Sequence, residues 1–598
     1  MGRQIDPNTA YRVGIHKNNG YLYACTQPGY LDQKTGKYKH KHYQWGKIDE
    51  NLKFYPGPRY LLATLEERRK LIFPSNWDLS ETTKYNTVSV SPPREIGIKD
   101  LNLLYGDVWL CERVSEITYI REDVFQVLNA NVWMTDIVMT LAIYLECGRE
   151  SFNNLPEYQQ FSKYPTSVLL TEKIITTVTQ SITEEQKMAL FRLRMARIPA
   201  GSFCAVDSTT RYAYGEKLPD VVVGKSKEKI KRPQTVELVV YSLDAHAPVY
   251  SRTFPGNMPD SRTLNLIIDE IESLGAKDIV LITDRGYENT RNINLCIGRS
   301  QKLVTATKLI HAPILKRIRE IGEFGHSPDG DKMNYDWREN LCYRQYDIGP
   351  GFKDAADAVG SACKARLNLY LDPDERSREL SSLKISVEAE REALEETRQK
   401  GYDLDTDSQN AVKYEFFKLD RDPATNTLKG FTLNEKKVNR KKLLAGFFAN
   451  TTVGIDMGAI EAHQHYNLRD EQEKYFSRMK SLMGVKCQRV WSDESKQGRE
   501  FILFVAQVIG SYISHIRKTK LDIKEFPSSI KVLNTMKNIR YIEHPGSVPY
   551  LTPFVGKQVT ICEAFGFKIP EGSAPQYSIK KTDENSTPCG KVHVSPDS

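Results

Sequence analysis

Four residues in one short stretch have the types and the spacing that phosphate chemistry requires. They are Tyr466, Arg469, Glu473 and Lys480, in the pattern Y-x2-R-x3-E-x6-K. At 100° per residue, these positions fall within about 60° of arc on a single helix. The pattern therefore predicts one helix face on which a carboxylate able to bind a metal ion is flanked by cations able to bind phosphate. The alternative is a solvated surface helix rich in charged residues.

Two aspartates upstream end apolar segments typical of buried strands. Asp207 follows residues 203–206, and Asp284 follows residues 278–283. The order of these segments lets the two strands lie side by side, so we expect Asp207, Asp284 and Glu473 to converge. Such a cluster is unfavourable without cations, and its oxygen ligands favour Mg²⁺ or Mn²⁺ over zinc. A pair of these ions can activate water or a 3′-hydroxyl and stabilise the leaving oxygen of a phosphodiester.

Each aspartate taken alone could instead be a helix cap or a turn residue. Asp278 and Asp244 rank lower as candidates, because Asp278 precedes its strand and Asp244 lies in a turn. His463 and His465 form an H-x-H pair, but no third ligand is nearby in the sequence. We therefore interpret that pair as structural.

Length and composition bound the class of protein. A chain of 598 residues is long enough for three or four domains. The formal net charge of +8, from 84 Lys and Arg against 76 Asp and Glu, is compatible with a polyanionic partner. The ten cysteines form no C-x2-C pair, which argues against a zinc ribbon and for a reducing compartment. No apolar stretch reaches the roughly 20 residues that span a bilayer, so we expect a cytoplasmic protein without a membrane partner.

The sequence of the segment that contains both aspartates predicts a mixed sheet. Between about residues 199 and 307 the pattern is three strands, a helix, a strand, a helix and a strand, which predicts a sheet with helices against it. Residues from about 309 to 442 interrupt it, with a charged helical run over 374–400. The apolar residues 443–448 then predict a strand that returns to the sheet.

The N-terminal residues alternate aromatic and basic side chains. Turn signals within residues 11–60 predict a small antiparallel sheet with hairpins. Lys37, Lys39 and Lys41 give it a basic face suited to phosphate contacts. An ordinary lysine-rich hairpin is the alternative. Residues from about 116 to 195 are helical in pattern.

With these motifs, the chain resembles the DDE transposases of bacterial insertion sequences, in the hairpin-forming superfamily with the YREK signature. Asp207 in Ala-Val-Asp-Ser-Thr and Asp284 in Thr-Asp-Arg-Gly-Tyr match the family's two aspartates, and Glu473 matches its glutamate. The resemblance implies an α/β catalytic core, a ribonuclease H-like mixed sheet with flanking helices. The long interval between Asp284 and Glu473 is similar to that of family members with a subdomain inserted at this position. The resemblance to the family also implies two divalent ions, the terminal inverted repeats and target DNA as partners, and a homodimer when two ends are synapsed.

The resemblance implies roles for other residues. Arg469 would bind a pair of phosphate oxygens, Lys480 would add a point charge, and Tyr466 would contact a terminal phosphate. In this superfamily the nicked 3′-hydroxyl commonly attacks the opposite strand to form a hairpin, and an aromatic side chain holds a flipped base. Trp337 is the candidate for that platform. The alternative for Trp337 is a core tryptophan of the insertion.

Together, the patterns and the resemblance divide the chain into seven segments. They are a β-rich basic candidate DNA-binding domain (1–65), a helical DNA-binding or linker region (66–198), a first part of the catalytic core (199–308), an inserted subdomain (309–442), a second part of the core (443–520), a C-terminal region (521–570) and a tail expected to be disordered (571–598).

The function that follows is a transposase that excises its element by metal-dependent hydrolysis and transesterification and joins the 3′-ends to target DNA. Two other functions stay open. One is a domesticated DNA-binding protein without catalysis, and the other is a metal-dependent nuclease without strand transfer.

Overall fold

A computed structural model describes most of the chain between residues 11 and 570. The gaps are at 19–20, 32–37, 41, 58, 61–62, 64, 83–100, 150, 214–217, 219, 225–231, 277, 323–331, 355–363, 402–413, 482–486, 489, 491 and 546. The expectation of a disordered tail over 571–598 lies outside the described residues.

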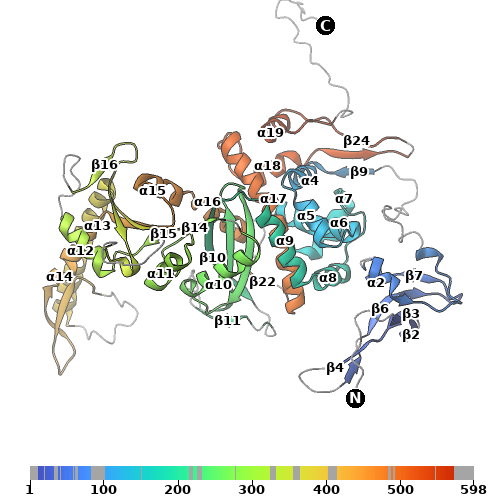
Figure 1. Ribbon diagram of the computed structural model, residues 1–598, viewed down its shortest axis with the longest axis horizontal. Helices are drawn as coiled ribbons and strands as arrows, with labels where there is room; N and C mark the ends of the chain where they lie inside the picture. Colours follow the sequence, from blue (N-terminus) through green and yellow to red (C-terminus); the bar gives the residue numbers. More distant parts are fainter. Residues whose placement is uncertain are drawn as a thin grey trace, which may run out of the picture.

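An eleven-stranded mixed sheet forms the centre of the fold (Figure 1). Its first part consists of β10 (Phe203–Ala213), β12 (Pro233–Ser242), β13 (Ala247–Pro255), β14 (Val280–Thr283) and β15 (Leu303–Thr307). The strand order is β13-β12-β10-β14-β15, with β10, β12 and β13 antiparallel and β14 and β15 parallel to β10. Helix α10 (Asp260–Ser273) connects β13 to β14, and α11 (Thr290–Arg299) connects β14 to β15. The prediction of a mixed α/β fold with these successive elements is confirmed.

The same sheet continues beyond β15. Strand β21 (Phe447–Val453) pairs antiparallel with both β15 and β18 (Ala365–Leu371), and β17 (Leu341–Ile348) and β16 (Asn334–Asp336) follow outward. The remaining elements between β15 and β21 are α12 (Ala312–Ile321), η2 (Pro350–Phe352), α13 (Pro373–Lys400), β19 (Phe417–Arg421), β20 (Leu428–Leu433) and α14 (Glu435–Leu444). Residues 309–442 therefore add strands to the central sheet as well as helices and a hairpin at its end (Figure 1).

The predicted strand over 443–448 begins later than expected. Leu443 and Leu444 still belong to α14, and β21 starts at Phe447. Gly446, with φ of 73°, makes the reversal between them. A Cβ there would lie 2.5 Å from the Cβ of Arg376, so the close approach of α13 also requires glycine.

A layer of helices packs against the β13 side of the sheet. It consists of α4 (Gly106–Ile117), α5 (Ile120–Val127), α6 (Val132–Glu146), η1 (Phe152–Asn154), α7 (Leu155–Phe161), α8 (Glu172–Ser181), α9 (Glu184–Ala196) and α17 (Asp493–Lys520). Helices α17 and α9 both contact β13, and α17 also packs against α4, α6 and α8 (Figure 1). Phe191 joins these layers, since its ring contacts those of Tyr250 on β13 and Phe504 on α17 at centroid distances of 5.1 and 4.9 Å. The predicted helical region is confirmed.

The C-terminal elements pack against the start of the helical layer. They are α18 (Ser529–Met536), β23 (Arg540–Glu543), β24 (Tyr550–Leu551) and α19 (Lys557–Phe565), and β23 pairs with β9 (Leu101–Leu104). Trp109 on α4 contacts Phe554, with ring centroids 5.2 Å apart. None of the helices in the described ranges is both long and apolar enough to cross a bilayer.

The N-terminal residues form a separate small sheet with its own core. The order is β2 (Gly14–Asn18), β3 (Tyr21–Thr26), β6 (Tyr43–Ile48) and β7 (Phe54–Pro56), all antiparallel, as predicted. Trp45, Phe54 and Trp77 are buried in the core. Neighbouring short elements are β1 (Tyr11–Arg12), β4 (Gly29–Leu31), β5 (Tyr38–His40), α2 (Leu65–Arg69) and β8 (Leu71–Ile72). Lys39 lies on β5, and Lys37 and Lys41 lie outside the described residues.

Candidate active site

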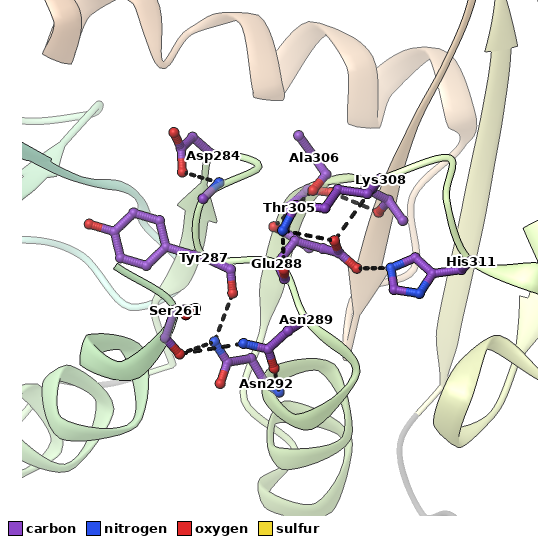
Figure 2. Close-up of polar contacts among 12 residues, drawn as sticks. Ser261, Asp284, Tyr287, Glu288, Asn289, Asn292, Thr305, Ala306, Lys308 and His311 are labelled. Carbon is purple, nitrogen blue, oxygen red and sulfur yellow. Dashed lines mark hydrogen bonds and ion pairs between the residues drawn. The ribbon is translucent and has the colours of Figure 1, made fainter. Parts of the chain in front are cut away.

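Asp207 and Asp284 stand at neighbouring positions of two central strands. The parallel strands β10 and β14 pair Val206 with Thr283, so each aspartate is the next residue beyond this pair. Neighbouring strands lie about 4.8 Å apart, so the two aspartates lie side by side. Asp207 lies within β10, which continues to Ala213, whereas Asp284 directly follows the end of β14. Asp207 is 7% exposed, and its Oδ1 accepts a hydrogen bond of 2.7 Å from the backbone N–H of Ser208. Asp284 Oδ1 accepts one of 2.7 Å from Gly286 N (Figure 2).

A third carboxylate, Asp260, lies beside this pair. It is the first residue of α10, and its Oδ1 accepts a hydrogen bond of 2.6 Å from the hydroxyl of Ser208. A Cβ placed on Gly286 would lie 2.9 Å from Asp284 Oδ1 and 3.3 Å from Asp260 Oδ2. Glycine therefore leaves the space in which these two carboxylates approach each other. Asp260 could not be recognised from the sequence, because an acidic residue in the first turn of a helix is common for electrostatic reasons alone.

Tyr287 is a buried phenol among these acids. Burial, followed by the negative charges of Asp260 and Asp207, raises its pKa well above the usual value. The phenol therefore stays protonated and keeps a hydrogen available for a neighbouring oxygen. Tyr287 follows Asp284 in the same loop, so this loop contributes both a carboxylate and a hydrogen-bond donor to the site (Figure 2).

Buried polar contacts hold the loop that carries Asp284. The carboxylate of Glu288 is buried and lies 2.7 Å from His311 Nε2, and Lys308 Nζ donates to the Glu288 carbonyl at 2.8 Å (Figure 2). On the other side, Asn292 Nδ2 donates to the carbonyls of Tyr287 and Ser261 at 2.7 and 3.0 Å. The loop is thus fixed to β15, α11 and α10 at once, which orients Asp284.

The prediction of one helix through residues 466–480 is wrong. The structure has two helices, α15 (Ala459–Asn467) and α16 (Asp470–Ser481), separated at Leu468 and Arg469. Helix α15 contacts β15, β17, β18 and β21, whereas α16 contacts β10 and α17. Because the sheet twists, one straight helix could not follow both parts. Tyr466 therefore belongs to a different helix from Glu473.

Helix α16 begins directly over the strand that bears Asp207. Arg469 Nη1 lies 3.9 Å from Asp207 Oδ2. Gln472 Nε2 donates a hydrogen bond of 2.8 Å to the carbonyl of Val239, which is the register partner of Asp207 on β12. Glu473 follows at the next position, and Lys480 lies near the end of the helix. The side chains of Glu473 and Lys480 lie outside the described residues, so their convergence with Asp207 stays a prediction.

Tyr466 and Trp337 differ in exposure. The half-buried ring of Tyr466 faces the guanidinium of Arg469, whose carbon lies 5.5 Å from the ring centroid. Trp337 lies between β16 and β17 and is 74% exposed, with the Arg338 guanidinium 5.3 Å from its ring centroid. The alternative that Trp337 is a core tryptophan of the insertion is therefore wrong.

The lower-ranked candidates have structural contacts. His463 lies against Tyr370 and Phe448 with centroids 5.3 and 5.4 Å apart, and His465 stacks on Phe203 at 3.9 Å. Asp244 Oδ2 accepts a hydrogen bond of 3.1 Å from Phe203 N, and Asp278 pairs with Lys302 at 2.6 Å. These contacts account for all four side chains without a catalytic role.

Residues 199–508 match the family described as Transposase DDE domain. The chain belongs to this family. Its Transposase DDE domain begins just before β10, includes both aspartates, the interrupting segment and α16, and ends within α17. None of the curated proteins matches the chain. A solved structure of a piggyBac transposase synaptic complex with hairpin DNA aligns with 72% of this chain and 79% of that chain, at 10% identity and a TM-score of 0.35. At that TM-score the resemblance supports no statement about fold or function.

Proposed function

We propose that the protein is a transposase that binds the ends of its insertion sequence, cuts them by metal-dependent phosphodiester hydrolysis and joins the freed 3′-ends to target DNA. The observation that carries the proposal is the pairing of Asp207 and Asp284 at adjacent strand positions within a Transposase DDE domain. A homodimer forms when two ends are synapsed. The N-terminal sheet, with Lys37, Lys39 and Lys41, and the helical region contribute to DNA binding.

The catalytic core is proposed to be ribonuclease H-like. The order β13-β12-β10-β14-β15, with three antiparallel strands followed by two parallel ones, supports this assignment. Residues 309–442 would be the inserted subdomain between the second aspartate and Glu473, and residues 443–520 the second part of the core. The pattern formed by Tyr466, Arg469, Glu473 and Lys480 supports membership of the YREK-signature superfamily.

Asp207, Asp284 and Glu473 are the proposed metal ligands. This donor set fits Mg²⁺ or Mn²⁺, because it consists of carboxylate oxygens without sulfur or imidazole. Asp260 adds a further carboxylate next to Gly286. Two bound ions would polarise the phosphodiester and neutralise charge on the attacking and leaving oxygens. The chain's own part is to hold these carboxylates at fixed positions through Ser208, Gly286 and the contacts of Glu288.

The decisive experiment is a cleavage assay on a duplex that carries the terminal repeat of the element. Purified protein with Mg²⁺ should nick the repeat end, and in the presence of target DNA it should yield joined products. Cleavage without joining would identify a nuclease, and binding without cleavage would identify a domesticated DNA-binding protein. Inverted repeats and a target duplication in the DNA that flanks the gene would independently support a mobile element.

Arg469→Ala should weaken DNA binding and reduce its salt dependence. Arg469 forms an ion pair with Asp207. A metal ion bound to Asp207 would weaken this pair, and the guanidinium would then bind a phosphate. Loss of one phosphate contact lowers the slope of log K against log salt by about 1. Binding measured at several salt concentrations tests this, with Arg391→Ala as a control, because Arg391 pairs with Glu388 on α13. An unchanged slope for Arg469→Ala would mean that this side chain does not contact DNA.

Trp337→Ala should reduce hairpin formation while leaving the first nick nearly intact. The exposed indole can stack on a flipped base, and such stacking contributes about 1 to 3 kcal/mol. Hairpin ends are scored on denaturing gels, where they migrate differently from nicked strands. Trp337→Phe keeps an aromatic face and should retain most of the hairpin yield. Equal hairpin yields from the alanine variant and the native protein would exclude this role.

A further inference from the structure

Three side chains of types that bind metal ions meet beside helix α16: His246, Glu471 and His515. His246 comes from the turn between β12 and β13, Glu471 from the first turn of α16 and His515 from α17. One ligand atom from each lies within 4.8 Å of the other two. His246 Nδ1 is 3.1 Å from Glu471 Oε2, and the two imidazole rings stack with centroids 3.4 Å apart and planes at 15°. Among the described residues, this is the one group of three His, Cys, Asp or Glu that meets so closely.

One imidazole nitrogen of this group has no partner. Nδ1 of His515 is buried and has no hydrogen-bond partner among the described residues. The carboxylate of Glu471 belongs to the same group, and its Oε2 lies against His246 Nδ1. An unpartnered imidazole nitrogen and a carboxylate oxygen therefore lie close together.

The ligand types select a class of ion. Two imidazole nitrogens and one carboxylate oxygen are preferred by Zn²⁺ and by neighbouring transition metals such as Co²⁺ and Ni²⁺. The carboxylates of Asp207 and Asp284 favour Mg²⁺ or Mn²⁺ instead. A small cavity at the cluster, lined in part by Tyr241, Ser511 and Ser514, gives access to a water that could complete the coordination.

We propose that His246, Glu471 and His515 bind one transition-metal ion that fastens α16 to α17 and to the β12–β13 turn. Glu471 and Glu473 are two residues apart, which is about 200° around a helix axis. The two positions therefore lie on opposite sides of α16, and an ion on Glu471 would leave position 473 available for the proposed catalytic centre. Such an ion fixes the orientation of the helix that carries Glu473. Lys518 lies at the same cavity, and its charge opposes cation binding, so Lys518→Met should increase the affinity.

Metal binding by the full chain tests the proposal without DNA. Protein freed of metal by a chelator is dialysed against Co²⁺ or Zn²⁺ in the presence of excess Mg²⁺, and bound metal is counted per chain. We expect one ion per chain, with a visible Co²⁺ spectrum typical of nitrogen and oxygen ligands. His246→Gln and His515→Gln should weaken binding by more than the roughly 10- to 100-fold lost with an outer-shell partner. His463→Gln, which removes a half-buried histidine packed on aromatic rings, should leave binding unchanged.

Two further measurements distinguish loss of the proposed metal site from misfolding of the variants and from metal binding at Asp207 and Asp284. The metal-free variants should unfold at the same temperature as the metal-free native chain, and Zn²⁺ should slow hydrogen exchange across Asp470–Ser481 in the native chain only. Asp207→Asn should keep the ion. No bound ion, undiminished binding by His246→Gln, or loss of the ion in Asp207→Asn would each overturn the proposal. None of these readouts depends on transposase activity.

Discussion

Asp207→Asn should reduce cleavage of an end-containing duplex by about 1,000-fold or more, while binding of the same duplex changes little. The substitution keeps the size of the side chain and removes the charge that would hold a divalent ion on β10, beside the end of β14. Metal ions contribute several kcal/mol of charge stabilisation in phosphoryl transfer, and about 4 kcal/mol corresponds to this loss in rate. Gel-shift and cleavage assays on one labelled duplex, with Mg²⁺, measure both quantities.

The surroundings of Asp207 indicate that this variant will fold. An asparagine Oδ1 can still accept the hydrogen bond from Ser208 N, and the substitution loses the ion pair of 3.9 Å with Arg469. The unfolding midpoint should therefore change little. Asp244→Asn is the matched control, because Asp244 accepts a hydrogen bond from Phe203, the first residue of β10. Asp244→Asn should cleave normally, and full cleavage by Asp207→Asn would refute the metal-ligand assignment.

Asp207 and Asp284 could be recognised from the sequence because each follows a short run of apolar residues. Such runs predict buried strands. The predicted strand end at Asp207 is wrong, because β10 continues to Ala213, but the register with β14 still brings Asp207 beside Asp284. The break between α15 and α16 could not be predicted in this way. The break falls at a leucine and an arginine, Leu468 and Arg469, and neither residue type predicts the end of a helix. It arises because α15 and α16 pack against different parts of a twisted sheet.

Groups assembled from distant segments left no signal in the sequence. Asp260 reaches the site because α10 begins beside the loop of Asp284, and its contact with Ser208 depends on the register of β10. His246, Glu471 and His515 come from a turn and two helices that are far apart in the chain. Spacing rules detect ligands that share one helix or loop, so a site built by packing between elements becomes visible only in three dimensions.

Arg211→Met should destabilise the central sheet strongly, by about 3 to 5 kcal/mol. Arg211 lies four residues after Asp207 on β10, is 1% exposed, and donates to Glu237 Oε2 on β12 at 2.9 Å. Methionine would leave the Glu237 carboxylate buried without this partner. The unfolding midpoint should fall by about 10 °C. Arg252→Met, on β13, removes a partly exposed pairing with Glu270 on α10 and should cost at most about 1 kcal/mol.

The loss in Arg211→Met should depend on pH in a defined direction. Burial already raises the pKa of Glu237, although Arg211 opposes the shift, and removal of Arg211 should raise it further. The folded variant then keeps a proton that the unfolded chain loses near pH 4.3, so the free energy of unfolding falls as pH rises from there to the folded-state pKa. The variant should approach the native stability in acid, and Arg211→Met with Glu237→Met should restore it at neutral pH. Thermal unfolding across this pH range measures both effects, and a loss that does not vary with pH would mean that lost packing, rather than the unpaired carboxylate, dominates.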